Sequence, residues 1–123
     1  MKLIELLEAV TALRGQQYAT DTLVGWVNEI EGQVIEEVIN AAEGFDLEFA
    51  PMEYGVDDER ELVVPERFQD VYLNYLLSKI DFNNQETERY NNDVVMFNSS
   101  YDAFAGWFRR KHVPKRGKSF TRF

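Results

Sequence analysis

The chain has 123 residues, 45% of them hydrophobic and 14% aromatic, which predicts one globular domain and not a disordered chain. It contains no cysteine, so disulfides and cysteine-ligated zinc are excluded. No apolar run in the sequence approaches the ~18 residues that a membrane-spanning helix needs, and no signal-peptide pattern opens it. We therefore expect a protein with no membrane partner that is made and used in the cytoplasm.

The net charge of −9 conceals two oppositely charged parts of the chain. Residues 1–108 carry six Lys or Arg and all 22 acidic residues, a balance of −16, whereas residues 109–123 carry seven Lys or Arg and no acid. Such an asymmetry suggests that the two parts meet different surfaces. The acidic body argues against ordinary duplex binding, because that affinity comes mainly from cations that neutralise phosphates.

The first two helices are predicted from apolar residues three and four positions apart, which share one face of a helix. The first spans residues 2–13. The second has Thr20 as a plausible N-cap and ends at Gly44. Gly25 and Gly32 lie on nearly the same face of this helix. Because each weakens it by about 1 kcal/mol relative to Ala, we expect a close backbone contact there.

The middle of the chain changes from a helical to an alternating pattern. Residues 45–49 alternate Phe or Leu with an acid, as β-strands do, and residues 62–64 form a second β-prone run. Pro51 makes the first run an edge strand or its end. We expect a β-hairpin or an extended flap over residues 45–64.

Two further helices are predicted over residues 65–82 and 90–108, joined by the polar turn 83–85. So short a connection makes the two helices antiparallel. Pro65 suits the first position of its helix, where the missing N–H costs nothing. The helix that it opens is apolar nearly all round, so we expect it to be sandwiched on more than one side. Part of its surface could contact another subunit.

The last of these helices carries the most regular apolar pattern, with successive steps of four, three, four, three and four. This core stripe lies along one side of a helix. Asn98-Ser99-Ser100 is its weak point, because these side chains compete with the helical backbone for hydrogen bonds. The predicted fold is mainly all-α, a small bundle of about four helices with the inserted flap. The core stripe consists of Tyr90, Val94, Phe97, Tyr101, Phe104 and Phe108.

Catalytic chemistry has no candidate in this sequence. His112, the only histidine, stands in a basic run with no acid or nucleophile near it, so we interpret it as a solvated residue. Glu36-Glu37 and Asp57-Asp58-Glu59 read as solvated charge, because helical neighbours do not face each other and a calcium loop needs other spacing. We find no phosphate-binding glycine loop and no nucleophile elbow. We expect no enzyme, no cofactor and no metal site.

The C-terminal residues 114–123 are predicted to form an extended basic tail beyond a helical domain of residues 1–113. Two interpretations stay open: a disordered end that adds solubility, or a docking peptide. Aromatic residues interleaved with cations favour docking, since free tails seldom keep exposed aromatics. The candidate partner-binding residues of this segment and of the helix end before it are Arg109, Arg110, Lys111, Lys115, Arg116, Lys118, Phe120, Arg122 and Phe123.

The whole chain resembles the small head–tail connector (adaptor, DNA-packaging) proteins of long-tailed bacteriophages. Residues 18–32, from Tyr-Ala-Thr-Asp-Thr-Leu to Glu-Ile-Glu-Gly, look like the second helix of that family. The better match starts at Val64-Pro65-Glu66-Arg67-Phe68, runs to Tyr75 and continues with Glu86-Thr87-Glu88-Arg89-Tyr90-Asn91-Asn92 and Phe97-Asn98. The motifs are architectural, and the family has no catalytic residues to carry over.

The resemblance implies a virion protein made in the bacterial cytoplasm, from a phage or a prophage. About twelve copies would form a ring below the portal, extend the DNA channel and present a docking surface to a tail-completion or stopper protein. The C-terminal segment of relatives reaches towards the portal, which would give the basic tail a destination. An acidic body lining a channel would repel phosphates and let DNA pass without sequence-specific binding.

Two rival functions from other classes remain. One is a small nucleic-acid-binding regulator that uses the tail as a basic arm, which weak and salt-insensitive DNA binding would exclude. The other is a small-molecule-binding or enzymatic helical bundle, which needs a pocket with convergent polar groups. The sequence offers no such set.

Overall fold

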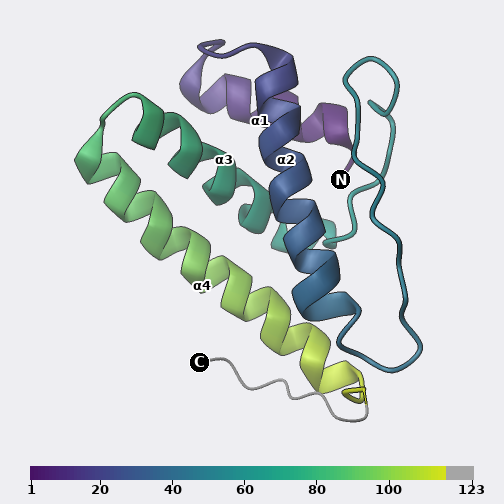
Figure 1. The fold of residues 1–123 in the computed structure, drawn as a ribbon. Coiled ribbons are helices and arrows are strands. Elements are labelled where there is room, and N and C mark those ends of the chain that lie inside the picture. Colours follow the sequence, from purple (N-terminus) through teal and green to yellow (C-terminus); the bar gives the residue numbers. More distant parts are fainter. Residues whose placement is uncertain (116–123) are drawn as a thin grey trace.

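The computed structural model describes residues 1–115, which form four helices with a long extended segment between the second and the third (Figure 1). This is an all-α fold, as the sequence predicts. A π-helical turn (η1) continues the second helix, and a 3-10 turn (η2) precedes the third. The elements are α1 (Leu3–Arg14), α2 (Thr20–Val34), η1 (Ile35–Ile39), η2 (Glu66–Phe68), α3 (Asp70–Asn83) and α4 (Thr87–Lys111).

The ends of α1 and α2 differ in detail from the predicted ones. α1 stops where Gly15 takes a φ of 76° and its N–H donates to Thr11 O at 2.7 Å. Thr20 is the first residue of α2 and not its cap, because Ala19 holds the N-cap position. The second helix, with η1, ends at Ile39 and not at Gly44.

α3 is the central helix of the bundle, since it packs against α1 and α2 on one side and runs antiparallel beside α4 on the other (Figure 1). The expected sandwich is therefore confirmed. Most of its apolar residues are used within this protomer, whereas Phe82 near its C-terminal end is 62% exposed. Those that are buried are Val71, Tyr72, Leu76, Leu77 and Ile80.

α4 runs without a break through the weak point at Asn98-Ser99-Ser100. The Ser100 hydroxyl donates to Phe97 O at 3.0 Å, so it bonds a carbonyl of its own helix. Ser100 is half-buried, and its neighbours Asn98 and Ser99 are exposed. The competing side chains are thus satisfied by their helix or face outward, and the helix persists.

The flap over residues 45–64 takes the extended form, because residues 1–115 contain no β-strand and only two isolated β-bridges. The expected strand at residues 45–49 is wrong for a physical reason. Asn40 supplies both partners of Leu47, with Oδ1 accepting its N–H and Nδ2 donating to its carbonyl, each at 2.9 Å. Asn28 does the same for Met52 at 2.8 and 3.1 Å. Side-chain amides of a helix thus replace the partner strand.

The π-helical turn helps these two asparagines to reach the same segment. In a straight α-helix, residues twelve apart point about 120° away from each other, at 3.6 residues per turn. In η1 the Asn40 N–H donates to Ile35 O, five residues back, at 2.8 Å. This wider turn rotates the later residues back towards the side of Asn28. Between the two lies Gly32, whose missing Cβ would stand 3.6 Å from the Phe49 ring. The expected close backbone contact is wrong at both glycines, because Gly32 meets only the Phe49 side chain at an ordinary contact distance and a Cβ at Gly25 would meet nothing within 4 Å.

Candidate partner-binding site

The core stripe divides into two halves along α4. Tyr101, Phe104 and Phe108 are buried, with Phe104 only 1% exposed. Tyr90, Val94 and Phe97 are half-buried, because they lie where α4 meets only the last turns of α3. The two parts of α4 therefore differ in what they present: the first half keeps apolar surface accessible, and the second is locked into the core.

A cluster of rings in edge-to-face and tilted contacts covers the C-terminal end of α4. Its centre is Phe108, whose ring lies 4.2 Å from that of His112, and Phe45 of the flap contacts both at 5.5 and 5.0 Å between centroids. His112 is therefore half-buried among aromatic rings, which corrects its interpretation as a solvated residue. Such edge-to-face pairs contribute about 0.5–1.5 kcal/mol each beyond the area that they bury.

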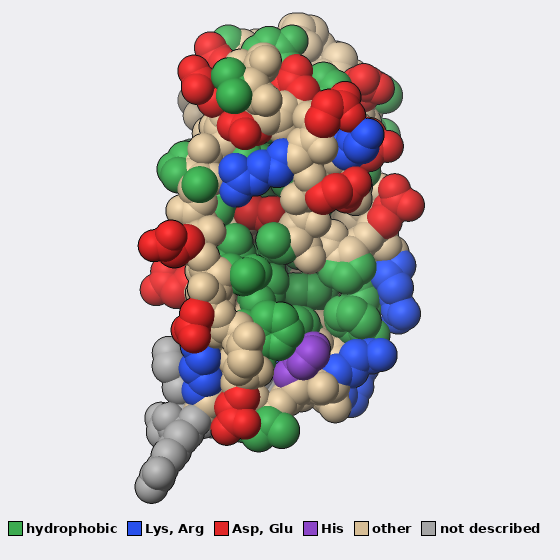
Figure 2. All heavy atoms as spheres, turned by 90° about the vertical axis from the view of Figure 1, so that its right-hand side faces the viewer, with side chains coloured by type: hydrophobic (Ala, Val, Ile, Leu, Met, Phe, Trp, Pro, Cys, Tyr) green, Lys and Arg blue, Asp and Glu red, His purple; other side chains and the backbone are tan. Residues whose placement is uncertain are grey.

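Lys and Arg side chains lie around the same end of the molecule. The Arg67 guanidinium lies 4.7 Å from the centroid of Phe68 and 5.6 Å from that of Trp107, and Lys111 Nζ lies 5.1 Å from Trp107. On the face shown in Figure 2, hydrophobic side chains form a hollowed patch beside His112, and Lys and Arg side chains flank it. A partner that binds here would meet aromatic surface bordered by positive charge.

The candidate basic residues are placed in three ways. Arg109, Arg110 and Lys111 form the last turn of α4, where the negative end of the helix dipole favours cations. Lys115 lies against the end of η1: its N–H donates to Ala41 O at 2.9 Å and its Nζ to Asp46 at 2.8 Å. The remaining candidates lie outside the described residues: Arg116, Lys118, Phe120, Arg122 and Phe123.

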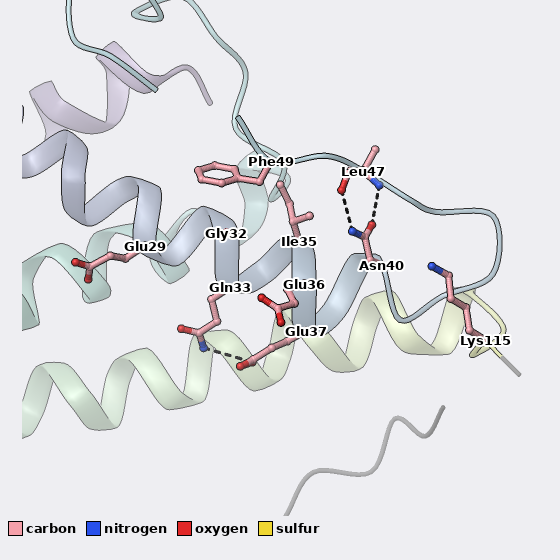
Figure 3. A pocket seen from close by; sticks show the side chains of 10 residues that line it. All are labelled: Glu29, Gly32, Gln33, Ile35, Glu36, Glu37, Asn40, Leu47, Phe49 and Lys115. Carbon is pink, nitrogen blue, oxygen red and sulfur yellow. Dashed lines mark hydrogen bonds between the residues drawn. The ribbon is translucent and has the colours of Figure 1, made fainter. Parts of the chain in front are cut away.

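A groove of about 690 Å³ runs along the outer side of α2 and η1 and reaches Lys115 (Figure 3). Its acidic lining consists of Glu29, Glu36 and Glu37, and the flap closes it with Leu47 and Phe49. The glutamates retain acceptor capacity. Glu37 uses Oε2 for the Tyr101 hydroxyl at 2.9 Å, Glu29 uses Oε1 for the Tyr75 hydroxyl at 2.7 Å and the Lys79 ammonium at 3.1 Å, and Glu36 is exposed. The groove suits a ligand that is cationic and partly apolar.

Three helices meet at a buried ionic cluster. Arg14 of α1 donates to both oxygens of Asp81 of α3, at 3.2 and 2.9 Å, and stands 3.8 Å from Asp93 of α4. Burial raises the pKa of Asp93 to about 7, and a hydrogen bond with Asp81 and its charge add to that shift. Burial would also raise the pKa of Asp81, but hydrogen bonds from Arg14 and Asp93 hold it below its usual range. Of the two acids, Asp93 is thus the one that is protonated more readily.

A second buried acid fastens the end of the flap. Glu31 is 1% exposed, and it accepts the Tyr72 hydroxyl at 2.6 Å and the Val63 N–H at 2.9 Å. The Tyr72 oxygen in turn accepts the Val64 N–H at 2.9 Å. Burial raises the pKa of Glu31, although these hydrogen bonds oppose the rise. The arrangement is structural, because every polar atom of the Glu31 side chain is occupied by the fold.

Sequence reasoning missed both buried clusters and the two asparagines that hold the flap. A signal existed for Glu31, which falls in the apolar spacing of Val27, Ile30 and Val34 on the buried side of α2. Asp81 likewise follows Ile80 in an apolar helix. The partners of these acids come from distant positions in the chain, and helical periodicity carries no information about them.

Within the described part of the chain, no group of three or more His, Asp or Glu side chains is arranged to hold a metal ion. No helix among residues 1–115 has both the length and the apolar composition to cross a membrane. No protein-family model, curated protein or solved structure matches this chain. The fold and its surfaces therefore define the class of protein: a small all-α bundle with an inserted flap held by side chains.

Proposed function

We propose that this protein is a head–tail connector of a long-tailed phage or prophage. Copies of it form a ring below the portal, extend the DNA channel and present a surface to the tail-completion or stopper protein. The resemblance of residues 64–75 and 86–98 to that family motivates the proposal. The observation that supports it best is a pair of exposed apolar patches on opposite sides of the protomer.

The first patch lies on α4, where Val95 and Met96 are 65% and 48% exposed. The second lies at the tip of the flap, where Tyr54 and Val56 are 46% and 72% exposed. α4 and the flap flank the bundle on opposite sides (Figure 1). Two different patches on opposite sides suit a head-to-tail contact between neighbouring copies, which generates rings when the rotation closes. The proposed interface thus uses α4 and the flap.

The test uses one charged substitution in each patch. Val95→Glu and Val56→Glu should each abolish rings seen by negative-stain microscopy on a portal template, and leave the melting temperature unchanged because both side chains are exposed. Mixed together, the two variants keep one intact interface and should form a pair that sediments as a dimer. The matched control, Thr22→Glu on the exposed side of α2, should still form rings. Rings that persist in both patch variants would contradict the proposed interface.

The rival function is a small nucleic-acid-binding regulator. It draws support from the basic last turn of α4, which together with Arg67 concentrates cations at one end of an acidic molecule. A regulator of this kind loses affinity steeply as salt rises, because each phosphate contact releases counterions. DNA titrations at two salt concentrations separate the functions: a connector binds weakly at both.

A further inference from the structure

We propose that the groove along α2 and η1 is the docking site of the chain's own basic C-terminal segment, residues 116–123, in the free protein. The inference goes beyond the connector function and does not depend on it. It rests on three observations: the position at which the described chain ends, the opposite charges of segment and groove, and the length of the segment.

The last described residues, 113–115, are anchored at the groove by backbone contacts. Val113 O accepts the Glu43 N–H at 2.8 Å, Pro114 forms a β-bridge with Ala42, and Lys115 itself lines the groove. Lys115, the last described residue, therefore lies at the η1 end of the groove (Figure 3). Because the segment is tethered there, docking in the same molecule is favoured by a high effective concentration.

Length and charge fit the groove. The eight residues beyond Lys115 reach at most about 26 Å when extended. The helical rise from Asn40 back to Glu29 is about 16 Å, so the segment can follow the whole groove. It carries three Lys or Arg and no acid, and the groove offers Glu29, Glu36 and Glu37. The positive charges of the segment would therefore be neutralised by the acids of the groove.

The order of side chains also agrees. In an extended chain, positions 118, 120 and 122 point to one side, so a Phe stands between two cations. In the groove, Gly32 and the flanking Phe49 ring stand between Glu29 and Glu36. Lys118 beside Glu36 would place Phe120 against Phe49 and Arg122 near Glu29.

The absence of cysteine allows a direct test on the full chain. A nitroxide spin label on Ser119→Cys should strip most of the intensity from the NMR signals of the Gly32 and Glu36 amides. The signals of Glu8 on α1 and Gln85 in the α3–α4 turn should keep theirs. Glu36→Gln combined with Glu37→Gln should restore the groove signals, as should ~1 M salt, where the Debye length falls to about 3 Å. Glu48→Gln, an acid on the flap outside the groove, is the matched control and should change nothing.

Two outcomes would overturn the proposal. Groove amides that keep full intensity show that the segment does not dock there. Broadening that appears in a mixture of isotope-labelled unmodified protein with spin-labelled unenriched protein shows docking between copies instead. Neither outcome involves the portal, so the connector function would stand or fall separately.

Discussion

Phe104 is the most buried member of the core stripe, with rings of Phe68, Trp107 and Phe108 around it. Phe97 on the same stripe is half-buried and contacts Tyr75 and Tyr101. Truncating Phe104 to Ala should therefore lower the free energy of unfolding by about 3–5 kcal/mol, through lost burial and a cavity that cannot collapse.

Phe97→Ala is the matched control on the same helix, and it should lower the free energy of unfolding clearly less than Phe104→Ala does. Chemical denaturation of both variants measures the difference. The stripe alone predicts equal losses at these positions, so equal midpoints would show that both halves of α4 are packed alike.

Asp93 makes stability depend on pH. In the unfolded chain it ionises near pH 4, and in the fold its pKa is about 7, so the folded protein keeps a proton that the unfolded chain has lost. Its contribution is complete below about pH 4 and is lost as pH rises towards 7. The charges that face it are Arg14, Asp81 and Arg89. Asp93→Asn removes this titration and should raise the melting temperature at pH 8 relative to the parent, but not at pH 4.

Asp81 has the opposite sign, since its lowered pKa contributes stability above about pH 4 that is lost on acidification. Asp81→Asn is therefore the variant to compare with Asp93→Asn. It should lower the stability of the folded protein at pH 8, because Arg14 loses its charged partner. Melting temperatures of the parent and of Asp93→Asn that differ by the same amount at every pH from 4 to 8 would show that folded Asp93 is ionised throughout this range.

Among the elements, the flap depends on side chains of α2 and not on strand pairing. Asn28→Ala should leave the Met52 N–H without its acceptor and cost about 1 kcal/mol. Amide hydrogen exchange at Met52 should then accelerate, while Leu47, held by Asn40, should change less. Gln33→Ala, between the two asparagines on the helix, is the control. Exchange at Met52 that stays as slow as in the parent would mean that packing of its buried side chain suffices.

The four helices could be predicted from the sequence because each carries a long apolar period and a turn at its ends. The flap could not. Its alternating residues have the strand pattern, yet Leu47 is exposed and the partners of its backbone are on Asn40, which periodicity does not reveal. The basic end of α4 was visible in the charge pattern, whereas the groove depends on the distance between α2 and the flap.

At the scale of the whole molecule, Lys115 is the last residue of the C-terminal segment whose contacts the structure describes. A chain that stops after Lys115 keeps the contacts to Ala41, Glu43 and Asp46, so its melting temperature should fall only by what docking of residues 116–123 contributes. A chain that stops after His112 loses these bonds, at about 1 kcal/mol each for the buried ones. Thermal melts compare the two.

The same pair of truncations tests portal attachment. If residues 116–123 join the portal, both chains should fail to co-sediment with it, although the shorter one is destabilised more. The double substitution Phe120→Ala with Phe123→Ala should weaken attachment more than Lys118→Ala, since exposed ion pairs contribute only ~0–1 kcal/mol each. Normal attachment of the chain ending at Lys115 would assign the segment a solubilising role.

The π-helical turn η1 has a consequence for how this gene can change. Loss of a single codon between Ile35 and Ile39 would turn η1 into ordinary α-helix and improve the local hydrogen-bond geometry. The residues that follow would keep their direction, because eleven α-helical steps of about 100° leave Asn40 only about 20° from Asn28, so Asn40 would still face Leu47. We therefore expect homologues to differ in length by one residue at this turn, as well as at the exposed tip of the flap.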